Sequence, residues 1–260
     1  MTILDQITAY KRREVGAKKA IFPISLLAGS QLYSRKCISL ANALRNSQHG
    51  IIAEHKRRSP SKAVINDKVL LPEVVKEYEN AGVSAISVLT DTKFFGGSLN
   101  DLLLARQNVS IPILRKEFII DPYQIHESKA YGADAILLIA NCLSEAELIE
   151  YSTLAKQLGM DVLLEVHNAT ELKKSLHPTV DILGVNNRNL KTFDVSLETS
   201  KKLSTLIPNE FVKVSESGIS STEAVTQLKP LGYQGFLIGE HFMKTNKPGE
   251  TAQKFIEQLK

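Results

Sequence analysis

A short repeated pattern constrains the fold of this chain more than any other feature of its sequence. In each copy a helical segment ends beside a glycine and an apolar run follows, at residues 81–89, 131–139, 158–166 and 231–239. Glycine is favoured just after a helix because it accepts the left-handed backbone conformation. Short, nearly continuous apolar runs are typical of parallel strands that are covered on both faces. The repeat therefore predicts alternating helices and buried parallel strands.

Further segments fit the same rhythm and bring the number of predicted strands to eight: residues 51–54, 112–116, 181–185 and 211–214. Helical patterns lie between the strands, at residues 72–80, 99–108, 122–131, 144–158, 169–176, 196–206, 220–228 and 249–259, with Asn100, Asp121, Ser144 and Ser220 as predicted N-caps. This order predicts an α/β protein with a (βα)8 TIM barrel. A doubly wound sheet is the alternative, but no Gly-x-Gly-x-x-Gly follows any predicted strand.

The first 46 residues contain no strand pattern. Ile3, Ile7, Tyr10 and Val15 have roughly helical spacing, and the pattern breaks at Phe22-Pro23. We therefore expect residues 1–260 to form a single barrel domain, in which residues 1–46 are an N-terminal helical extension.

The composition of the chain argues against several kinds of protein. The formal net charge is only +4 and no basic stripe alternates with aromatic residues, so we expect no nucleic-acid partner. Two cysteines do not make a disulfide framework, which favours a reducing compartment. No apolar run approaches the roughly 20 residues of a membrane span, and the N-terminus lacks a secretory signal pattern. The sequence thus predicts a cytoplasmic protein without a membrane partner.

Charged residues follow the apolar runs at several predicted strand ends, where barrels of this kind build their sites. Glu54 and Lys56 share the face of Ile52 because side chains alternate along a strand. Further polar residues at or near strand ends include Lys116, Glu165, Asn186, Arg188 and Glu216. Each one alone is an ordinary strand end, but their convergence on one rim favours an active site. Burial and like charges there predict a lowered lysine pKa or a raised glutamate pKa, suitable for acid–base chemistry.

The last two predicted strands are followed by loops that indicate a phosphate site. Ser217-Gly218 precedes one helix and Gly239-Glu240 opens a short segment, and glycine allows a close backbone approach to an anion. Ser59, after the first strand, adds a hydroxyl. Ordinary turn geometry is the alternative for these glycines, but the agreement of two loops favours phosphate. The histidines show no spacing typical of a metal site, so we predict no metal.

In combination these motifs resemble the indole-3-glycerol phosphate synthase family of tryptophan biosynthesis, from about residue 3 to the C-terminus. The resemblance rests on IIAEHKRRSPS at 51–61, SAISVLTDTKFFGGS at 84–98, ILRKEFIIDPYQI at 113–125, GADAILLI at 132–139, LLEVH at 163–167, GVNNRNLKTF at 184–193, SESGI at 215–219 and LIGEHFM at 237–243. It implies a carbon–carbon lyase that closes the indole ring of 1-(2-carboxyphenylamino)-1-deoxyribulose 5-phosphate with loss of CO2 and water. It implies no cofactor, a small phosphorylated substrate, and other enzymes of tryptophan biosynthesis as candidate partners.

The resemblance also implies residue roles. Lys116 matches the general acid that protonates the ribulose carbonyl, and Glu165 its partner in the later dehydration. Lys56 matches the cation near the anthranilate carboxylate and the leaving hydroxyl, and Glu54 the residue that orients these groups. The remaining matches are Asn186 and Ser217 at the catalytic centre, Arg188, Glu216 and Phe118 on the substrate, and Ser59, Gly218, Gly239 and Glu240 at the phosphate end.

The sequence departs from the family pattern at two places. Glu117 follows Lys116 where the family usually has Asp, and alternation predicts that it faces away with little effect. Ala63-Val64 stands where glycine is common, which puts the shape or mobility of the first loop in question. Two other functions stay open: a phosphoribosyl isomerase, which would want a Cys/Asp or Asp/Asp pair at strand ends, and a non-catalytic phosphate-metabolite-binding barrel, which need not retain Lys116 and Glu165.

Overall fold

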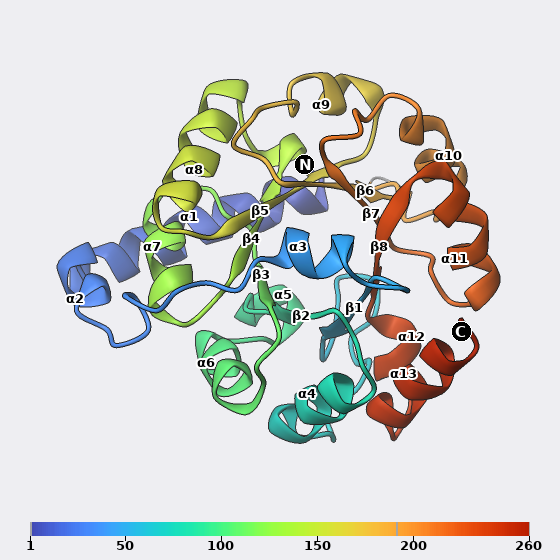
Figure 1. Ribbon diagram of the computed structural model, residues 1–260. Coiled ribbons are helices and arrows are strands. Elements are labelled where there is room, and N and C mark those ends of the chain that lie inside the picture. Colours follow the sequence, from blue (N-terminus) through green and yellow to red (C-terminus); the bar gives the residue numbers. More distant parts are fainter. Residues whose placement is uncertain (1, 191, 260) are drawn as a thin grey trace.

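The repeated pattern forms a closed barrel of parallel strands (Figure 1). The computed structural model describes residues 2–190 and 192–259. The eight strands in these ranges are β1 Ile51–His55, β2 Ala85–Leu89, β3 Ile113–Lys116, β4 Ala135–Ile139, β5 Asp161–Val166, β6 Ile182–Asn186, β7 Val212–Glu216 and β8 Tyr233–Ile238. Each strand pairs with its sequence neighbours, and β8 pairs with β1, so the predicted TIM barrel is confirmed.

Helices between the strands form the outer layer of the barrel. They are α4 Leu71–Asn80, α5 Thr92–Phe95, α6 Leu99–Asn108, α7 Tyr123–Ala130, α8 Glu145–Gln157, α9 Ala169–Lys173, α10 Glu198–Ser204, α11 Thr222–Leu228, α12 Glu240–Met243 and α13 Pro248–Glu257, with 3-10 turns η1 Ala140–Cys142 and η2 Lys229–Leu231. Every predicted helix between strands is present, and α5 and α12 are short additions.

The ends of these helices correct part of the sequence prediction. Asn100 does not cap α6, because the Ser98 hydroxyl accepts the N–H of Asp101 and starts the helix earlier. Ser220 does not cap α11, because the chain is still extended at Ser221 before the helix begins.

The other two predicted caps make the expected kind of contact. The Ser144 hydroxyl accepts the N–H of Glu147 in a capping box that begins α8. Asp121 accepts the N–H of Tyr123 at 2.9 Å, although Pro122 occupies the N-cap position of α7.

Three helices precede β1: α1 Ile3–Ile21, α2 Ile24–Ala28 and α3 Leu40–Arg45. Figure 1 shows α3 across the near end of the barrel, with α1 running behind the strands. Leu40 and Leu44 of α3 join the apolar cluster inside the barrel, and the Asp161 carboxylate accepts the Ser39 hydroxyl at 2.8 Å. α3 therefore closes the end of the barrel where the strands begin.

The core of the barrel has two layers because side chains alternate along each strand. Ile52, Leu114, Leu137 and Leu163 belong to the cluster inside the barrel, which α3 completes. The alternate positions, such as Ile86 of β2, pack against the helices in the outer cluster. With Ile52 inside, Glu54 and Lys56 follow on the same face and reach the far end of the barrel.

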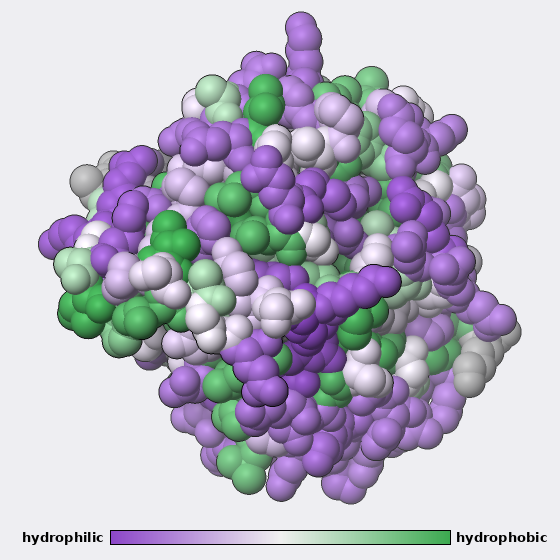
Figure 2. Space-filling view, turned by 60° about the vertical axis from the view of Figure 1, so that its left-hand side comes forward, coloured by the Kyte–Doolittle hydropathy of each residue, from purple (hydrophilic) through white to green (hydrophobic). Residues whose placement is uncertain are grey.

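The surface is largely polar on the face drawn in Figure 2, with hydrophobic side chains in smaller areas between polar ones. Exposed apolar side chains also cluster in sequence at the junction of α1 and α2, where Ile21 is 68% and Leu26 61% exposed. Across the described residues, no helix combines the length and apolar character needed to cross a membrane.

A glycine at the start of β1 allows the barrel to close. Gly50 has φ +64°, and a Cβ there would lie 1.8 Å from the carbonyl oxygen of Gln234 in β8. Gly159 also has a positive φ, +77°, but a Cβ there would meet nothing within 4 Å.

We expect Gly50→Ala to lower the free energy of unfolding by about 3 kcal/mol or more, because backbone strain and a clash add together. Gly159→Ala, the matched control, should cost only about 1 kcal/mol from strain. Urea unfolding followed by circular dichroism measures both. Equal losses would show that the close approach of β8 does not constrain Gly50.

Candidate active site

A cavity of about 360 Å³ opens where the carboxyl ends of the strands meet. Each residue that the sequence predicted for the site lines it: Glu54, Lys56, Ser59, Lys116, Phe118, Glu165, Asn186, Arg188, Glu216, Ser217, Gly218, Gly239 and Glu240. They come together because they stand at or just beyond the ends of neighbouring strands. The structure thus gives these residues a common location, and their individual roles stay predictions.

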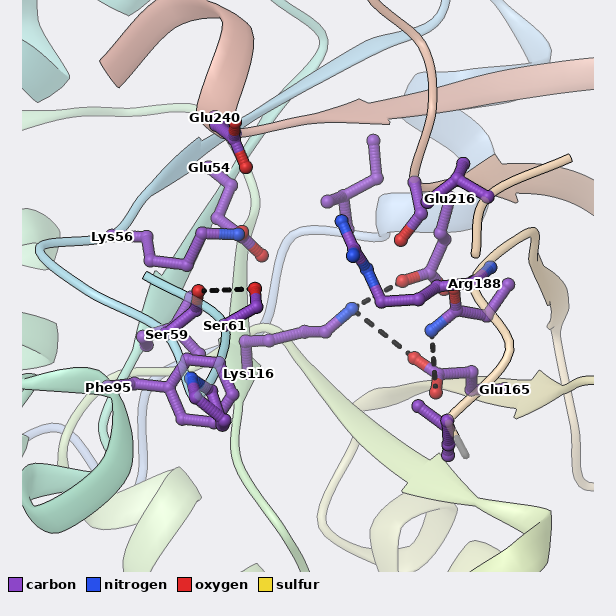
Figure 3. Close-up of a pocket in the computed structure, with 18 of the residues that line it drawn as sticks. Glu54, Lys56, Ser59, Ser61, Phe95, Lys116, Glu165, Arg188, Glu216 and Glu240 are labelled. Carbon is purple, nitrogen blue, oxygen red and sulfur yellow. Dashed lines mark hydrogen bonds and ion pairs between the residues drawn. The ribbon is translucent and has the colours of Figure 1, made fainter. Parts of the chain in front are cut away.

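Lys116 is the central cation of the cavity (Figure 3). Its Nζ forms an ion pair with Glu216 and lies 3.5 Å from Oε2 of Glu165. On the opposite wall Lys56 donates to Glu54 Oε1 at 2.7 Å. Gly184 leaves room for this cluster, because a Cβ there would lie 2.3 Å from Oε1 of Glu216. The cavity therefore holds alternating buried carboxylates and ammonium groups.

Burial and neighbouring charges shift the pKa values of these groups in different directions. Burial alone would lower the pKa of Lys116, but the charges of the surrounding glutamates, Glu216 first, raise it well above its ordinary value. The predicted lowering of a lysine pKa is therefore wrong for Lys116. Its three acidic neighbours outweigh the cost of burying one charge.

The two glutamates beside Lys116 differ from each other. Burial raises the pKa of Glu216, and the charge of Glu165 raises it further, against the opposing effect of Lys116. Burial would also raise the pKa of Glu165, but Lys116 and His167 together lower it. The predicted raised glutamate pKa is thus found at Glu216. One site containing an easily protonated and a firmly ionised carboxyl can separate acid and base roles.

Asn186 and Arg188 shape the loop after β6. Asn186 donates its side-chain amide to Glu165 Oε1 at 3.2 Å and accepts the N–H of Arg188 at 3.0 Å. Arg188 in turn donates from its guanidinium to the carbonyl of Phe193 at 3.1 Å. Asn186 therefore orients Glu165 while the loop folds back over the cavity. Lys191, within the motif at residues 184–193, lies outside the described residues.

The predicted phosphate end is formed by irregular backbone. Ser217 and Gly218 both have positive φ, +65° and +77°, and a Cβ on Gly218 would lie 2.6 Å from Val195 Cγ1. Gly239 immediately precedes α12, and a Cβ there would lie 2.5 Å from Oε1 of Glu54. Because Ser217 is not glycine, its positive φ is a strained conformation of the kind found at functional sites.

The loop after β1 is closed by its own hydrogen bonds. Ser59 and Lys62 exchange backbone hydrogen bonds of 2.9 and 3.0 Å, and the Lys62 side chain forms an ion pair with Glu240. Ala63 and Val64, which replace the usual glycine, follow this turn and are exposed. Their side chains therefore extend from the loop without occupying the cavity.

Some residues that line the cavity were not predicted from the sequence. Phe95, at the end of α5, has its ring 5.9 Å from that of Phe118, and Ile3, Leu4 and Ile7 of α1 line the cavity as well. Phe95 falls within the motif at residues 84–98, so an aromatic residue just beyond a strand was the available signal. The position of α1 had no such signal, because helical spacing does not tell which surface a helix covers.

His167 is a further residue that the sequence analysis did not single out. Its Nδ1 lies 3.0 Å from Glu171 Oε2, and its Nε2 lies 3.3 Å from Glu165 Oε1 at an angle outside hydrogen-bond geometry. Burial would lower the pKa of His167, but these two carboxylates raise it to about 10. The imidazolium therefore stays charged at neutral pH and holds Glu165 ionised. Within the described ranges no group of three or more His, Cys, Asp or Glu side chains could hold a metal ion.

The family model of indole-3-glycerol phosphate synthase matches residues 4–259. The chain belongs to the indole-3-glycerol phosphate synthase family. It is 48% identical to the indole-3-glycerol phosphate synthase of Bacteroides thetaiotaomicron over 257 residues, which cover 99% of this chain and 98% of that protein. It is 41% identical to the enzyme of the same name from Delftia acidovorans over 263 residues, covering 98% of each. The resemblance seen in the motifs therefore extends over nearly the whole chain.

Solved structures with low sequence identity support the fold. A chain of the tryptophan synthase α2β2 complex from Pyrococcus furiosus matches with a TM-score of 0.58 and 17% identity, over 81% of this chain and 97% of that one. The chain described as native KDPGal matches with a TM-score of 0.57 and 17% identity, over 80% and 91%. At this identity the likeness concerns the barrel alone.

The raised pKa of His167 predicts a particular pH dependence of stability. Because the folded pKa lies above the unfolded value, the stabilisation is complete below about pH 6.5 and disappears as pH rises through about 10. We expect wild type to exceed His167→Gln by on the order of 3 kcal/mol at pH 6, and by much less at pH 10. Urea unfolding at a series of pH values measures the difference.

A second variant locates the cause of this effect. Glu171→Gln removes the carboxylate at 3.0 Å, so the pH-dependent part of the difference should shrink when His167 is replaced in that background. A difference between wild type and His167→Gln that does not change from pH 6 to 10 would contradict the prediction.

Proposed function

We propose that this protein is an indole-3-glycerol phosphate synthase. It would convert 1-(2-carboxyphenylamino)-1-deoxyribulose 5-phosphate to indole-3-glycerol phosphate, CO2 and water. One observation carries the proposal: the Lys116 ammonium stands beside Glu216 and Glu165 in a cavity lined across from it by Glu54 and Lys56. A ketone, an aromatic carboxylate and a hydroxyl leaving group need cations and carboxylates arranged around one another in this way.

Ring closure is assigned to Lys116. As the ring carbon that bears the carboxylate attacks the ribulose carbonyl, a carbon–carbon bond forms and negative charge develops on the carbonyl oxygen. Lys116 donates a proton to that oxygen, and its buried position makes the charge stabilisation strong. The bond to the carboxylate then breaks, CO2 leaves, and the electron pair restores the aromatic ring.

The later dehydration is assigned to the carboxylates and to Lys56. Lys56 donates a proton to the hydroxyl, which leaves as water, while the nitrogen lone pair, conjugated through the aromatic ring, supplies the electron pair that stabilises the carbon left behind. Glu165 then accepts a proton from the neighbouring CH2 group, and its C–H electron pair forms the double bond that completes the indole. An ionised Glu165 suits this base role, and Asn186 and His167 hold it in place. Glu54 orients Lys56 and stabilises positive charge on the substrate nitrogen, and Glu216 and Ser217 contact the substrate from β7.

The remaining residues are assigned to the two ends of the substrate. Phe118, with Phe95 beside it, takes the aromatic ring, and Arg188 orients the carboxylate end. At the phosphate end the proposal places Ser59 together with the backbone of Gly218, Gly239 and Glu240.

The proposal also covers the domain organisation, location and partners of the protein. We regard residues 1–46 as an N-terminal helical extension of a single barrel domain, the protein as cytoplasmic, and other tryptophan-pathway enzymes as candidate partners. The isomerase alternative is disfavoured because that chemistry would want a Cys/Asp or Asp/Asp pair at strand ends, whereas the first strand is followed here by the Glu54–Lys56 ion pair.

Lys116→Ala tests the central role. Without its proton donor, turnover should fall at least about 10³-fold, while substrate binding stays largely intact because the other contacts remain. Indole fluorescence and CO2 release measure turnover against a low background, since the chain has no Trp, and calorimetry measures binding.

Lys76→Ala, on the exposed face of α4, is the matched control and should keep full activity. Normal turnover by Lys116→Ala would remove Lys116 from the acid role. Wild-type protein that binds the substrate without forming product would instead indicate a binding barrel.

A further inference from the structure

Lys11 of α1 is a buried cation that the proposed chemistry does not use. It is 1% exposed, although lysine is rarely buried without partners. Its Nζ lies 2.9 Å from Glu14 Oε2, 2.9 Å from Asp91 Oδ2 and 3.1 Å from Glu117 Oε1. Asp91 and Glu117 are themselves 0% and 3% exposed, and they follow β2 and β3. Lys11 therefore joins the N-terminal helix to two of the loops that build the cavity.

Each of these two acidic partners holds the backbone of an aromatic residue in the cavity. Asp91 Oδ1 accepts the N–H of Phe94 at 2.6 Å and of Phe95 at 3.3 Å, which begins α5. Glu117 Oε1 accepts the N–H of Phe118 at 2.9 Å. The rings of Phe95 and Phe118 then face the cavity with their centroids 5.9 Å apart. One lysine thus touches both carboxylates that set the places of the two rings.

The face of α1 that carries Lys11 also reaches the cavity and a larger set of ion pairs. Ile7 lies one helical turn before Lys11 and lines the cavity, as do Ile3 and Leu4. Beyond Lys11 the charges close into a ring of ion pairs that runs Lys11, Glu117, Arg115, Glu127, Lys18, Glu14 and back to Lys11. This closed set of ion pairs holds α1 against β3 and α7. Lys18 is the more exposed of the two lysines in it, with 32% of its side chain accessible.

We propose that Lys11 is a positioning residue for the aromatic end of the substrate. Through Asp91 and Glu117 it fixes the separation of Phe95 and Phe118, so that the docking of α1 sets the slot for the substrate's benzoate ring. Without Lys11 the buried Asp91 would lose its ion pair with this lysine, and Glu117 would keep its ion pair with Arg115 at 3.6 Å, so repulsion between the two carboxylates or their hydration would move both loops. The inference rests on the proposed function for the identity of the aromatic ligand.

The test compares Lys11→Met with Lys18→Met in the full-length protein. Methionine keeps the length of the side chain and removes its charge in both variants. We expect Lys11→Met to raise KM about tenfold with kcat changed less than about threefold, because the two rings contribute to binding in the ground state and transition state alike. Lys18→Met should keep a KM near that of wild type, because water can replace its partly exposed charge. Lys11→Arg should recover most of the affinity.

Inhibition by inorganic phosphate, a competitive inhibitor, distinguishes a specific change at the aromatic end of the site from a general loss of structure. Its inhibition constant should be unchanged in Lys11→Met, because Lys11 does not contact the loops at the phosphate end. If KM and the phosphate inhibition constant rise together, or if Lys11→Met behaves like Lys18→Met, the proposal is overturned. Thermal unfolding monitored by circular dichroism establishes that each variant is folded.

Asp91→Asn provides a second route if Lys11→Met does not fold. Asparagine keeps the cap on α5 but loses the ion pair with Lys11, so KM should rise several-fold while phosphate inhibition stays constant. A wild-type KM in Asp91→Asn would contradict the coupling. Wild-type protein without turnover would refute the proposed function, whereas an active wild type with an unaffected Lys11→Met would refute the role of Lys11 alone.

Discussion

Buried carboxylates at the rim of the barrel dominate this structure, because each must find a cation or hydrogen-bond donors where water is largely excluded. Glu54, Glu165 and Glu216 are all less than 5% exposed and lie above an apolar interior. Lys56, which immediately follows β1, and Lys116, at the end of β3, form ion pairs with them. The same requirement gives the cavity its chemistry, since a charge held in place away from water acts strongly on a substrate that enters.

Buried carboxylates also need cations in the layer of residues around the cavity. His167 lies between Glu165 and Glu171, and this second carboxylate keeps the imidazole charged without contacting the cavity cluster itself. On the other side Lys11 lies between Asp91 and Glu117. In both places a cation from outside the cluster compensates acidic groups at a strand end. The outer helices thus influence the site through charge as well as through packing.

Much of the fold could be predicted because its signals are local. Gly82, Gly132, Gly159 and Gly232 each carry a positive φ at the end of a helix or turn, and an apolar strand follows each one. The predicted site residues also gathered around one cavity, because parallel strands in a barrel all end on the same side. The errors in the predicted helix caps were local too. Ser98 caps α6 in place of Asn100, and the chain stays extended through Ser221, so α11 begins after the predicted cap at Ser220.

The sequence by itself determined the barrel and the side of it on which the site lies, because both follow from alternating helical patterns and short apolar runs and from the common direction of parallel strands. Only the tertiary structure decided which charges meet. The pKa of Lys116 rises because three glutamates from different strands surround it, and Lys11 of α1 lies within ion-pair distance of Asp91 and Glu117 from the loops after β2 and β3. Such pairings depend on distances between segments far apart in the chain, and no local pattern records those distances.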